Sequence, residues 1–149
     1  MAKAIFIVGL PGSGKTYYVC DLASEINAEK FDDFKADAID NCSHFTFARR
    51  YEELINKLRS GLDAIISDID FCKTESRDEA RQCIEQQVQG VEFEWIFFEN
   101  DPEKCRKNII RREKTRGRSE PETIKKLEMY SKKYEIPDGS FVEKVWDGD

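Results

Sequence analysis

The sequence predicts an α/β fold, a doubly wound parallel sheet of about five strands with helices on both faces. Short apolar runs, typical of strands buried on both faces, alternate along the chain with stretches whose apolar residues recur at helical spacing. A glycine-rich stretch follows the first apolar run and precedes the first helical stretch. Strands that alternate with helices in this way favour a parallel sheet with sites at the carboxyl ends of its strands.

The composition indicates one folded domain over residues 1–149. The chain is 40% hydrophobic and 11% aromatic, enough to bury one core at this length. Its five cysteines are odd in number and show no CxxC spacing, which indicates neither a disulfide framework nor a zinc site. Because no segment has the pattern of a signal peptide or a membrane span, we expect a cytoplasmic location and no membrane partner.

The glycine-rich stretch is Gly9-Leu10-Pro11-Gly12-Ser13-Gly14-Lys15-Thr16, which matches the pattern GxxxxGK[ST]. In this pattern backbone N–H groups and the following helix dipole form a cradle for phosphate. The residues expected to line the cradle are Gly9, Pro11, Gly12, Ser13 and Gly14. Lys15 would reach the β- and γ-phosphates and Thr16 would bind Mg²⁺, so ATP and Mg²⁺ are the expected cofactors. The alternative is a chance glycine-rich turn after a core strand.

The first half of the chain contains four further predicted elements. Apolar spacing predicts a helix over about 14–27 and a second helix over about 44–59, which ends at Ser60-Gly61. A second strand is expected to end within residues 30–34, and a buried strand over 64–66. These elements place acidic residues directly after two strands.

The second half predicts three helices and two strands. Ser76 is expected to cap a helix, with Glu79 completing a capping box, and a strand follows over 91–98. Asn100 or Asp101 would cap the next helix, and Pro102 would take a first-turn position. We expect a loop over 116–121, a last helix with its apolar stripe from 124 to 134, a turn at 136–139 and a final strand over 141–146.

Carboxylates follow two of the predicted strands. Asp32 and Asp33 are expected beside the glycine-rich loop, since the strand after the first helix usually lies close to the first strand. A carboxylate there could take the proton of a hydroxyl acceptor, although acids in loops are often only solvated. Asp68 ends the buried strand, where it could hold Mg²⁺ or simply cap the strand.

Positive charge is concentrated in one segment. The net charge is −6, but residues 104–118 carry eight basic side chains against Glu113 alone, which leaves −13 on the remainder. We interpret residues 104–121 as a lid whose arginines, Arg112, Arg116 and Arg118, close over the phosphates; a solvated basic surface is the alternative. The negative remainder weighs against a long polyanion as substrate.

A compact kinase fits these residues better than other users of nucleoside triphosphates. The chain has no Asn-Lys-x-Asp pattern for reading guanine, and it is too short for the extra helical subdomain of a ring-forming motor. Kinases that act on an alcohol benefit from a carboxylate that accepts the hydroxyl proton, so the acids at 32 and 33 favour a hydroxyl acceptor.

Several motifs occur in the order found in a known family. They are GLPGSGKT, Asp32-Asp33-Phe34-Lys35, Ile65-Ile66-Ser67-Asp68, Arg116-Gly117, and a helix ending Met129-Tyr130. Over about residues 4–134 the chain resembles the kinase domain of phage-type 5′-hydroxyl polynucleotide kinases.

This resemblance implies a role for each matched residue. Asp32 would be the general base on the 5′-hydroxyl, Arg116 would contact the donor phosphates, and Asp68 would act on the acceptor side. Lys35 stands where the family has an arginine for the acceptor's 3′-phosphate, which loses the bidentate fork. Asp33 is expected beside it in the acceptor site.

The sequence does not identify the molecule that accepts the phosphoryl group. The phosphatase domain of several relatives is absent, and residues 37–62 show no match. Nucleoside, antibiotic and sugar kinases and the zeta toxins share the loop and the lid, and a nucleotide-binding regulatory module without transferase activity is a further alternative.

Overall fold

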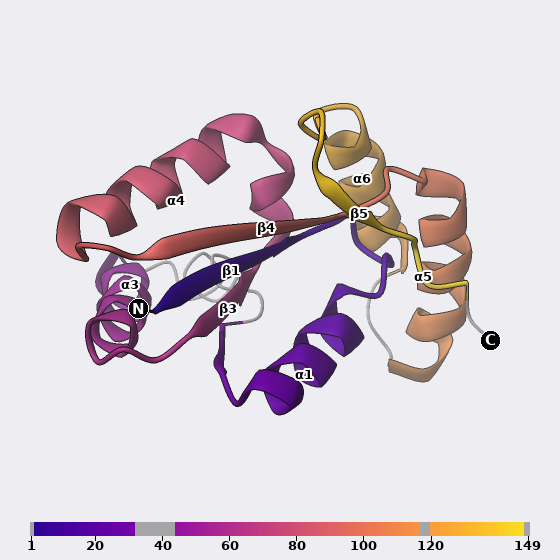
Figure 1. Cartoon of the computed structure of the whole chain (residues 1–149). Coiled ribbons are helices and arrows are strands. Elements are labelled where there is room, and N and C mark those ends of the chain that lie inside the picture. The colour runs from indigo at the N-terminus through magenta and orange to yellow at the C-terminus, as the bar shows by residue number, and fades with distance from the viewer. Residues whose placement is uncertain (1, 32–43, 117–119, 148–149) are drawn as a thin grey trace.

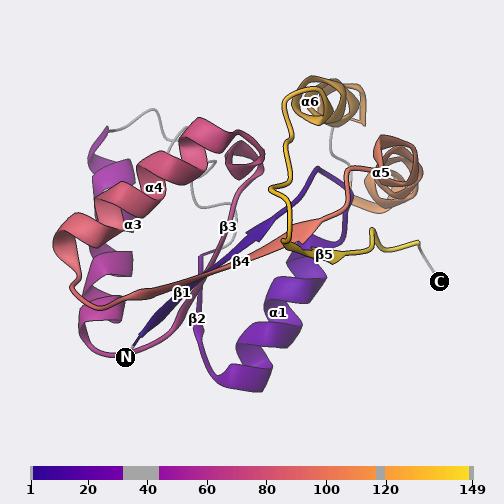
Figure 2. The same cartoon turned by 45° about the horizontal axis from the view of Figure 1, so that its top comes forward.

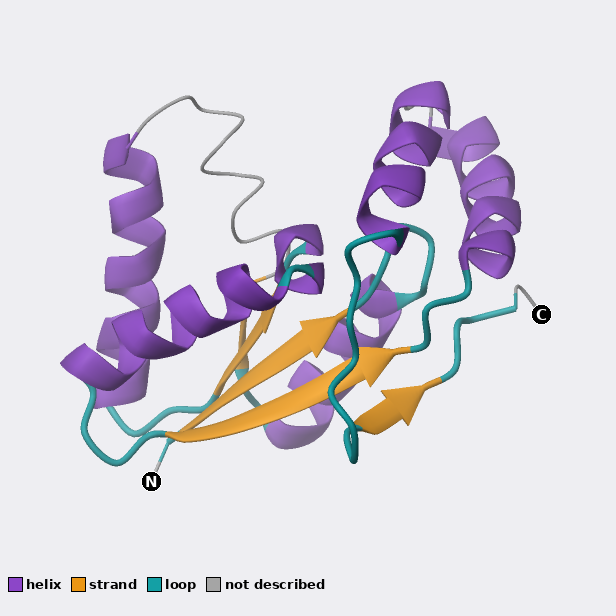
Figure 3. Cartoon of the chain, turned by 90° about the horizontal axis from the view of Figure 1, so that it is seen from above, coloured by secondary structure: helices purple, strands orange, loops and turns teal. Residues whose placement is uncertain are grey.

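The computed structural model describes residues 2–31, 44–116 and 120–147, with side chains described outside 44–50 and 113–116. Its centre is one five-stranded sheet of order β2-β3-β1-β4-β5 in which every neighbouring pair is parallel. The strands are β1 (Lys3–Val8), β2 (Glu29–Phe31), β3 (Ala64–Ser67), β4 (Glu92–Phe98) and β5 (Phe141–Glu143). All arrowheads in Figure 3 point to one edge of the sheet, so the predicted fold class is confirmed.

Helices cover the two faces unequally. Among the helices that the structure describes, only α1 (Lys15–Ile26) packs on one face, through Val19 and Ala23 against Ile5 and Ile7. Helices α3 (His44–Arg59) and α4 (Thr74–Gln87) cover the other face, as Figures 1 and 2 show from two directions. Helices α5 (Pro102–Arg116) and α6 (Glu120–Ser131) pack on each other at the carboxyl edge of the sheet.

The burial of each strand follows its sequence. Strand β1 has only apolar residues after Lys3, and all five are buried. In its centre Phe6 stacks on Trp95 with ring centroids 4.2 Å apart and meets Phe71 edge-on at 5.2 Å. Each fully buried side chain of this size contributes roughly 1.5–3 kcal/mol of hydrophobic stabilisation. Strand β1 is therefore fixed firmly where the glycine-rich loop begins.

The position of β2 corrects one prediction. Strand β2 pairs with β3, and β3 pairs with β1, so the second strand in the chain does not lie beside the first. The reason is apolar content. The four residues of β3 are fully buried and suit a place inside the sheet, whereas Glu29 and Lys30 of β2 are exposed and suit an edge.

The start of α4 corrects a second prediction. The helix begins at Thr74, two residues before the expected cap, and Lys73 at its N-cap makes no side-chain cap hydrogen bond. The predicted cap, Ser76, is buried and donates its hydroxyl to Asp70 Oδ2 at 2.8 Å. A short 3₁₀ helix, η1 (Ile69–Cys72), brings the Asp70 carboxylate within reach, and a carboxylate is a stronger acceptor for that hydroxyl than a backbone group.

Two boundaries near the end of the chain also differ from the prediction. Helix α6 begins at Glu120 and includes Pro121 in its first turn, where proline is tolerated, and α5 continues to Arg116, so the loop between them is shorter than 116–121. Strand β5 has three residues rather than the predicted 141–146. The chain leaves the sheet after Glu143 because its next residues bind the glycine-rich loop instead: Trp146 N–H donates to the Ser13 carbonyl at 3.1 Å.

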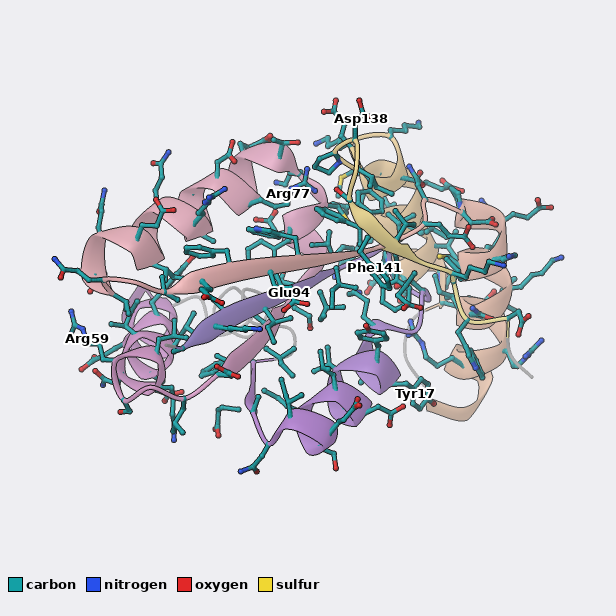
Figure 4. The ribbon with its side chains drawn as sticks, in the orientation of Figure 1. Tyr17, Arg59, Arg77, Glu94, Asp138 and Phe141 are labelled. Carbon is teal, nitrogen blue, oxygen red and sulfur yellow. The ribbon has the colours of Figure 1, made fainter. Side chains whose placement is uncertain are left out.

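Arg77 joins three parts of the fold (Figure 4). It is 5% exposed, and its guanidinium donates to the carbonyls of Phe71 (3.0 Å) and Glu135 (2.9 Å) and to Thr74 Oγ1 (2.9 Å). Burial lowers the pKa of Arg77. These bonds tie α4 to η1 and to the chain after α6, which holds the end of β3 in place.

Candidate functional site

The glycine-rich loop joins the end of β1 to the start of α1 in the conformation of an anion cradle. Gly12 and Gly14 have φ angles of 82° and 100°, the left-handed region that favours glycine. Ser13 N–H donates to the Leu10 carbonyl at 3.1 Å, which closes the turn. Backbone N–H groups in a loop of this kind point inward, and their partial positive charges add to the positive end of the α1 dipole.

Both of these glycines are also in close contact with other parts of the chain. A Cβ at Gly12 would lie 2.5 Å from the carbonyl oxygen of Cys105 on α5, and a Cβ at Gly14 would lie 2.9 Å from Trp146 Cβ. Neither contact leaves room for a side chain. The loop is therefore enclosed by α5 on one side and by the C-terminal segment on the other.

Lys15 lies at the first position of α1, half-buried, with Nζ 3.5 Å from the Leu10 carbonyl. The charge of Lys15 affects the pKa of two buried thiols. Burial raises the pKa of Cys72 and of Cys105 to about 12, and Lys15 lowers both against that trend. Both thiols stay protonated at neutral pH, so neither acts as a thiolate nucleophile beside the lysine.

The loop residues fit a phosphate group. Ser13 Oγ is buried and has no hydrogen-bond partner among the described residues, and a phosphate oxygen is an acceptor that could satisfy such a donor. The Thr16 side chain is exposed in the first turn of α1. With Lys15 these groups supply amides, hydroxyls and one cation, the donor set that a triphosphate requires.

Asp68 lies beside the loop, as the sequence predicted for a strand-terminal acid. The register pairs Ile7 with Ser67, so Asp68 comes level with Val8, immediately before Gly9. It is 2% exposed, and its Oδ1 accepts from the Asp70 N–H at 2.8 Å, which caps η1. The capping alternative is thus part of its role.

The donor set around Asp68 suits Mg²⁺ rather than a metal held wholly by protein. No group of three or more His, Cys, Asp or Glu side chains within the described ranges could hold a metal ion. Mg²⁺ commonly takes one or two protein oxygens and completes its shell with water and substrate phosphates. Asp68 and the Thr16 hydroxyl are the residues that would hold it.

The first half of the basic segment is not a free lid. Cys105, Asn108 and Ile109 are buried between α5 and the body of the protein, and Asp101 Oδ1 accepts from the Lys104 N–H at 3.2 Å as the predicted cap. Ion pairs join Lys104 to Glu99 (3.5 Å) and Arg106 to Glu128 of α6 (2.7 Å). Residues 104–109 therefore belong to the wall of the site.

Arg112 continues the inward face of α5. Positions 105, 108, 109, 112 and 116 follow the spacing of one helical face, and the first three contact the body. The positive charge of Arg112 lowers the pKa of the Cys105 thiol, which lies on the same face of the helix. Position 116 is the last of this helix, while the Arg116 side chain and the whole of Arg118 lie outside the described residues.

The predicted acceptor residues Asp32, Asp33 and Lys35 also lie outside the described residues. The last described residue before them is Phe31, the end of β2, which is paired with Ile66. The chain therefore leaves β2 toward the carboxyl edge of the sheet, two residues before the level of Asp68. The premise that β2 adjoins β1 is wrong, because β3 with Asp68 lies between them.

Three residues at the loop were missed by sequence reasoning. Glu99 follows β4, and its Oε1 accepts from Val145 N–H at 3.1 Å; Asn108 donates its amide to the Gly12 carbonyl at 2.9 Å; and Trp146 rests on Gly14. Asn108 carried a usable signal, since it is a neutral polar residue on the apolar face of a basic helix. Trp146 carried none, because its contact depends on the early end of β5.

A protein-family model described as an AAA domain, AAA_33, matches residues 5–137. The chain belongs to the AAA_33 family. This match covers the loop, Asp68 and both helices at the carboxyl edge of the five-stranded sheet. No helix in ranges 2–31, 44–116 and 120–147 is long and apolar enough to span a membrane.

Relatives of this AAA_33 protein include an uncharacterized protein of Acanthamoeba polyphaga mimivirus, 26% identical over 135 residues, which are 90% of this chain and 87% of the relative. A candidate kinase from Chloroflexus aurantiacus matches the fold with a TM-score of 0.67 at 19% identity, over 97% of this chain and 84% of the other.

Two further solved structures share the fold. A gluconokinase from Sinorhizobium meliloti has a TM-score of 0.63 at 15% identity, over 96% and 82% of the two chains. Kti12 of Chaetomium thermophilum, solved with ADP-AlF3, has a TM-score of 0.60 at 18% identity, over 98% and 90%. At these identities the comparison shows the fold of the AAA_33 chain and leaves its acceptor open.

Proposed function

We propose that this protein is an ATP-dependent kinase that transfers the γ-phosphoryl group to a hydroxyl, specifically the 5′-hydroxyl of a polynucleotide or nucleotide. The observation that carries the proposal is the anion cradle of Gly12 and Gly14 with the buried carboxylate of Asp68 level with its start. A cradle for phosphates beside a carboxylate for Mg²⁺ is the arrangement that phosphoryl transfer requires.

The donor side of the proposed reaction uses the loop. Backbone amides and Lys15 hold the β- and γ-phosphates, and Thr16 with Asp68 holds Mg²⁺. Mg²⁺ held by these residues would neutralise negative charge that develops during transfer. Arg112 and Arg116, whose positions on α5 follow the spacing of Cys105 and Asn108, would add positive charge at the transferring group, together with Arg118.

The acceptor side uses the carboxylate that follows β2. The acceptor oxygen forms a bond to the γ-phosphorus, the bond from that phosphorus to the bridging oxygen of ADP breaks, and the hydroxyl proton passes to the Asp32 carboxylate. Phe31 ends β2 at the edge of the sheet where the loop and Asp68 lie, which supports a base at position 32. Asp33 and Lys35 would contact the acceptor.

The choice of a nucleotide acceptor rests on the resemblance to phage-type 5′-hydroxyl polynucleotide kinases. Asp32-Asp33-Phe34-Lys35 and Arg116-Gly117 carry that resemblance. The charge of −13 outside residues 104–118 favours a short acceptor over a long polyanion, and therefore favours a nucleotide or an end of a strand. A small-molecule kinase for nucleosides, sugars or antibiotics is the second candidate, favoured by the same charge.

A transfer assay with γ-labelled ATP and Mg²⁺ tests the proposal. Its acceptors are 5′-hydroxyl oligonucleotides, nucleoside 3′-monophosphates, unphosphorylated nucleosides, and sugars including gluconate. We expect label on the nucleic-acid acceptors, with the 3′-phosphorylated nucleoside better than the plain nucleoside. Label only on sugars would replace the proposed acceptor with a small molecule. ATP binding without transfer to any acceptor would instead indicate a nucleotide-binding regulatory module.

A further inference from the structure

The segment after β5 crosses the glycine-rich loop as a strap, residues 144–147. Val145 is buried and donates its N–H to Glu99 Oε1 at 3.1 Å, and Trp146 donates its N–H to the Ser13 carbonyl at 3.1 Å. The Trp146 side chain begins directly over Gly14, where a Cβ would approach to 2.9 Å. The strap is thus fastened at two points, to Glu99 directly after β4 and to the loop itself.

Asn108 is the side chain that joins the strap to the loop. It lies on the inward face of α5 and is 6% exposed. Its amide nitrogen donates to the carbonyl of Gly12 at 2.9 Å and to the carbonyl of Trp146. The amide has two N–H groups, so both bonds can form at once. One buried side chain therefore bridges the loop and the strap, in addition to the direct bond from Trp146 N–H to Ser13.

The aromatic part of Trp146 stays open beside the loop. Trp146 is 43% exposed, and its ring lies 5.8 Å from that of Tyr17, tilted by 43°. Tyr17 is 58% exposed and projects from the first turn of α1, next to Thr16 (Figure 4). Large exposed aromatic rings beside a phosphate cradle offer a face on which a base can stack, worth roughly 1–3 kcal/mol per base.

We propose that Trp146 and Tyr17 bind the nucleoside end of the phosphate donor, and that Asn108 is the positioning residue that holds Trp146 in place for it. The inference rests on the proposed function only in requiring a nucleoside triphosphate at the loop. The loop holds the phosphates through its amides, and the strap beside Gly14 supplies an apolar wall within reach of the attached nucleoside. Affinity for the phosphates and affinity for the nucleoside then depend on different residues.

Calorimetric titration with two Mg²⁺-loaded probes, ATP and inorganic tripolyphosphate, separates these contributions. Trp146→Ala is expected to weaken ATP binding by about 5–150-fold, the equivalent of about 1–3 kcal/mol, and to leave tripolyphosphate binding within about twofold of wild type. Phe141→Ala is the matched control, because it removes another exposed aromatic side chain, on β5, and should change neither affinity.

The positioning role of Asn108 is tested with the same probes. Asn108→Leu should lower the affinity for ATP more than the affinity for tripolyphosphate. In a Trp146→Ala background the same change should lower the ATP affinity little further, because Asn108 acts by positioning Trp146. Asn108→Gln, which keeps the amide, should recover part of the loss. Equal losses for both probes, or full additivity with Trp146→Ala, would overturn this role.

Two outcomes of these titrations would contradict the inference. If the unmodified protein binds ATP and tripolyphosphate but Trp146→Ala changes neither affinity, the stacking inference is wrong while the proposed kinase stands. If the wild-type protein binds neither probe, the loop is no phosphate site, and the proposed function and this inference fail together.

Discussion

The donor side and the acceptor side of the site are built from unequal amounts of structure. The glycine-rich loop is held by β1 beneath it, by α5 at Gly12, and by the C-terminal strap at Gly14. The acceptor side begins at β2, a three-residue strand that pairs, among the described strands, with β3 alone. In the proposed kinase, phosphate binding would therefore depend on the packed core, whereas acceptor choice would depend on segments attached at the sheet edge.

A side chain at Gly12 should both destabilise the protein and abolish ATP binding. Gly12→Ala places a Cβ 2.5 Å from the Cys105 carbonyl in a residue with φ of 82°, so strain and overpacking should together cost roughly 2–5 kcal/mol of the free energy of unfolding. ATP binding should be lost with the loop geometry. Denaturant unfolding and calorimetry measure the two effects.

Gly139→Ala is the control for backbone strain alone. Gly139 has a φ of 78°, but a Cβ there meets nothing within 4 Å. The free energy of unfolding should fall by only about 1–2 kcal/mol, and ATP binding should persist. Equal destabilisation by the two variants would mean that the contact between the loop and α5 contributes nothing.

Removing the last arginine of α5 should affect turnover and spare donor binding. Arg116→Ala is expected to lower kcat by roughly 10³–10⁵-fold, the usual effect of an arginine that stabilises a transferring phosphoryl group. Arg106→Ala removes an exposed ion pair with Glu128 and should change stability by about 1 kcal/mol or less and kcat not at all. Comparable kcat values for the two variants would make α5 a purely structural helix.

The carboxylate at position 32 should affect only the acceptor step. Asp32→Asn is expected to lower kcat by roughly 10²–10⁴-fold while the affinity for ATP, measured by calorimetry, stays unchanged. Asp138→Asn, in an exposed turn far along the chain, is the control and should leave both values at the wild-type level. Unchanged turnover in Asp32→Asn would remove the assignment of the general base.

The sequence predicted most of the fold because each element has a local pattern. The helix over 44–59 was predicted with its observed bounds, since its apolar stripe and the Ser60-Gly61 stop are both local. The start of α4 was missed because Ser76 bonds to Asp70, a contact set by η1 rather than by neighbouring sequence. The prediction that the second strand lies beside the first was wrong for a similar reason, because the strand order depends on which strand can bury both of its faces.

The candidate site divides in the same way. Gly12, Gly14 and Lys15 belong to one continuous motif, so their placement in the loop follows from eight residues. Asn108 lies 96 residues along the chain from Gly12, and Trp146 lies further along still. They reach the loop through a helix face and an early strand end that no local pattern encodes. Sequence reasoning therefore predicted the loop and missed Asn108 and Trp146, which contact it.

Calorimetric titration of ATP with Mg²⁺ into the wild-type protein and into Lys15→Ala tests the central claim most directly, with Lys125→Ala on the exposed side of α6 as the control. If the loop is the donor site, Lys15→Ala should bind ATP at least about tenfold more weakly, because it loses the cation on the β- and γ-phosphates, and Lys125→Ala should match wild type. Equal ATP affinity in all three proteins would contradict the assignment of the loop.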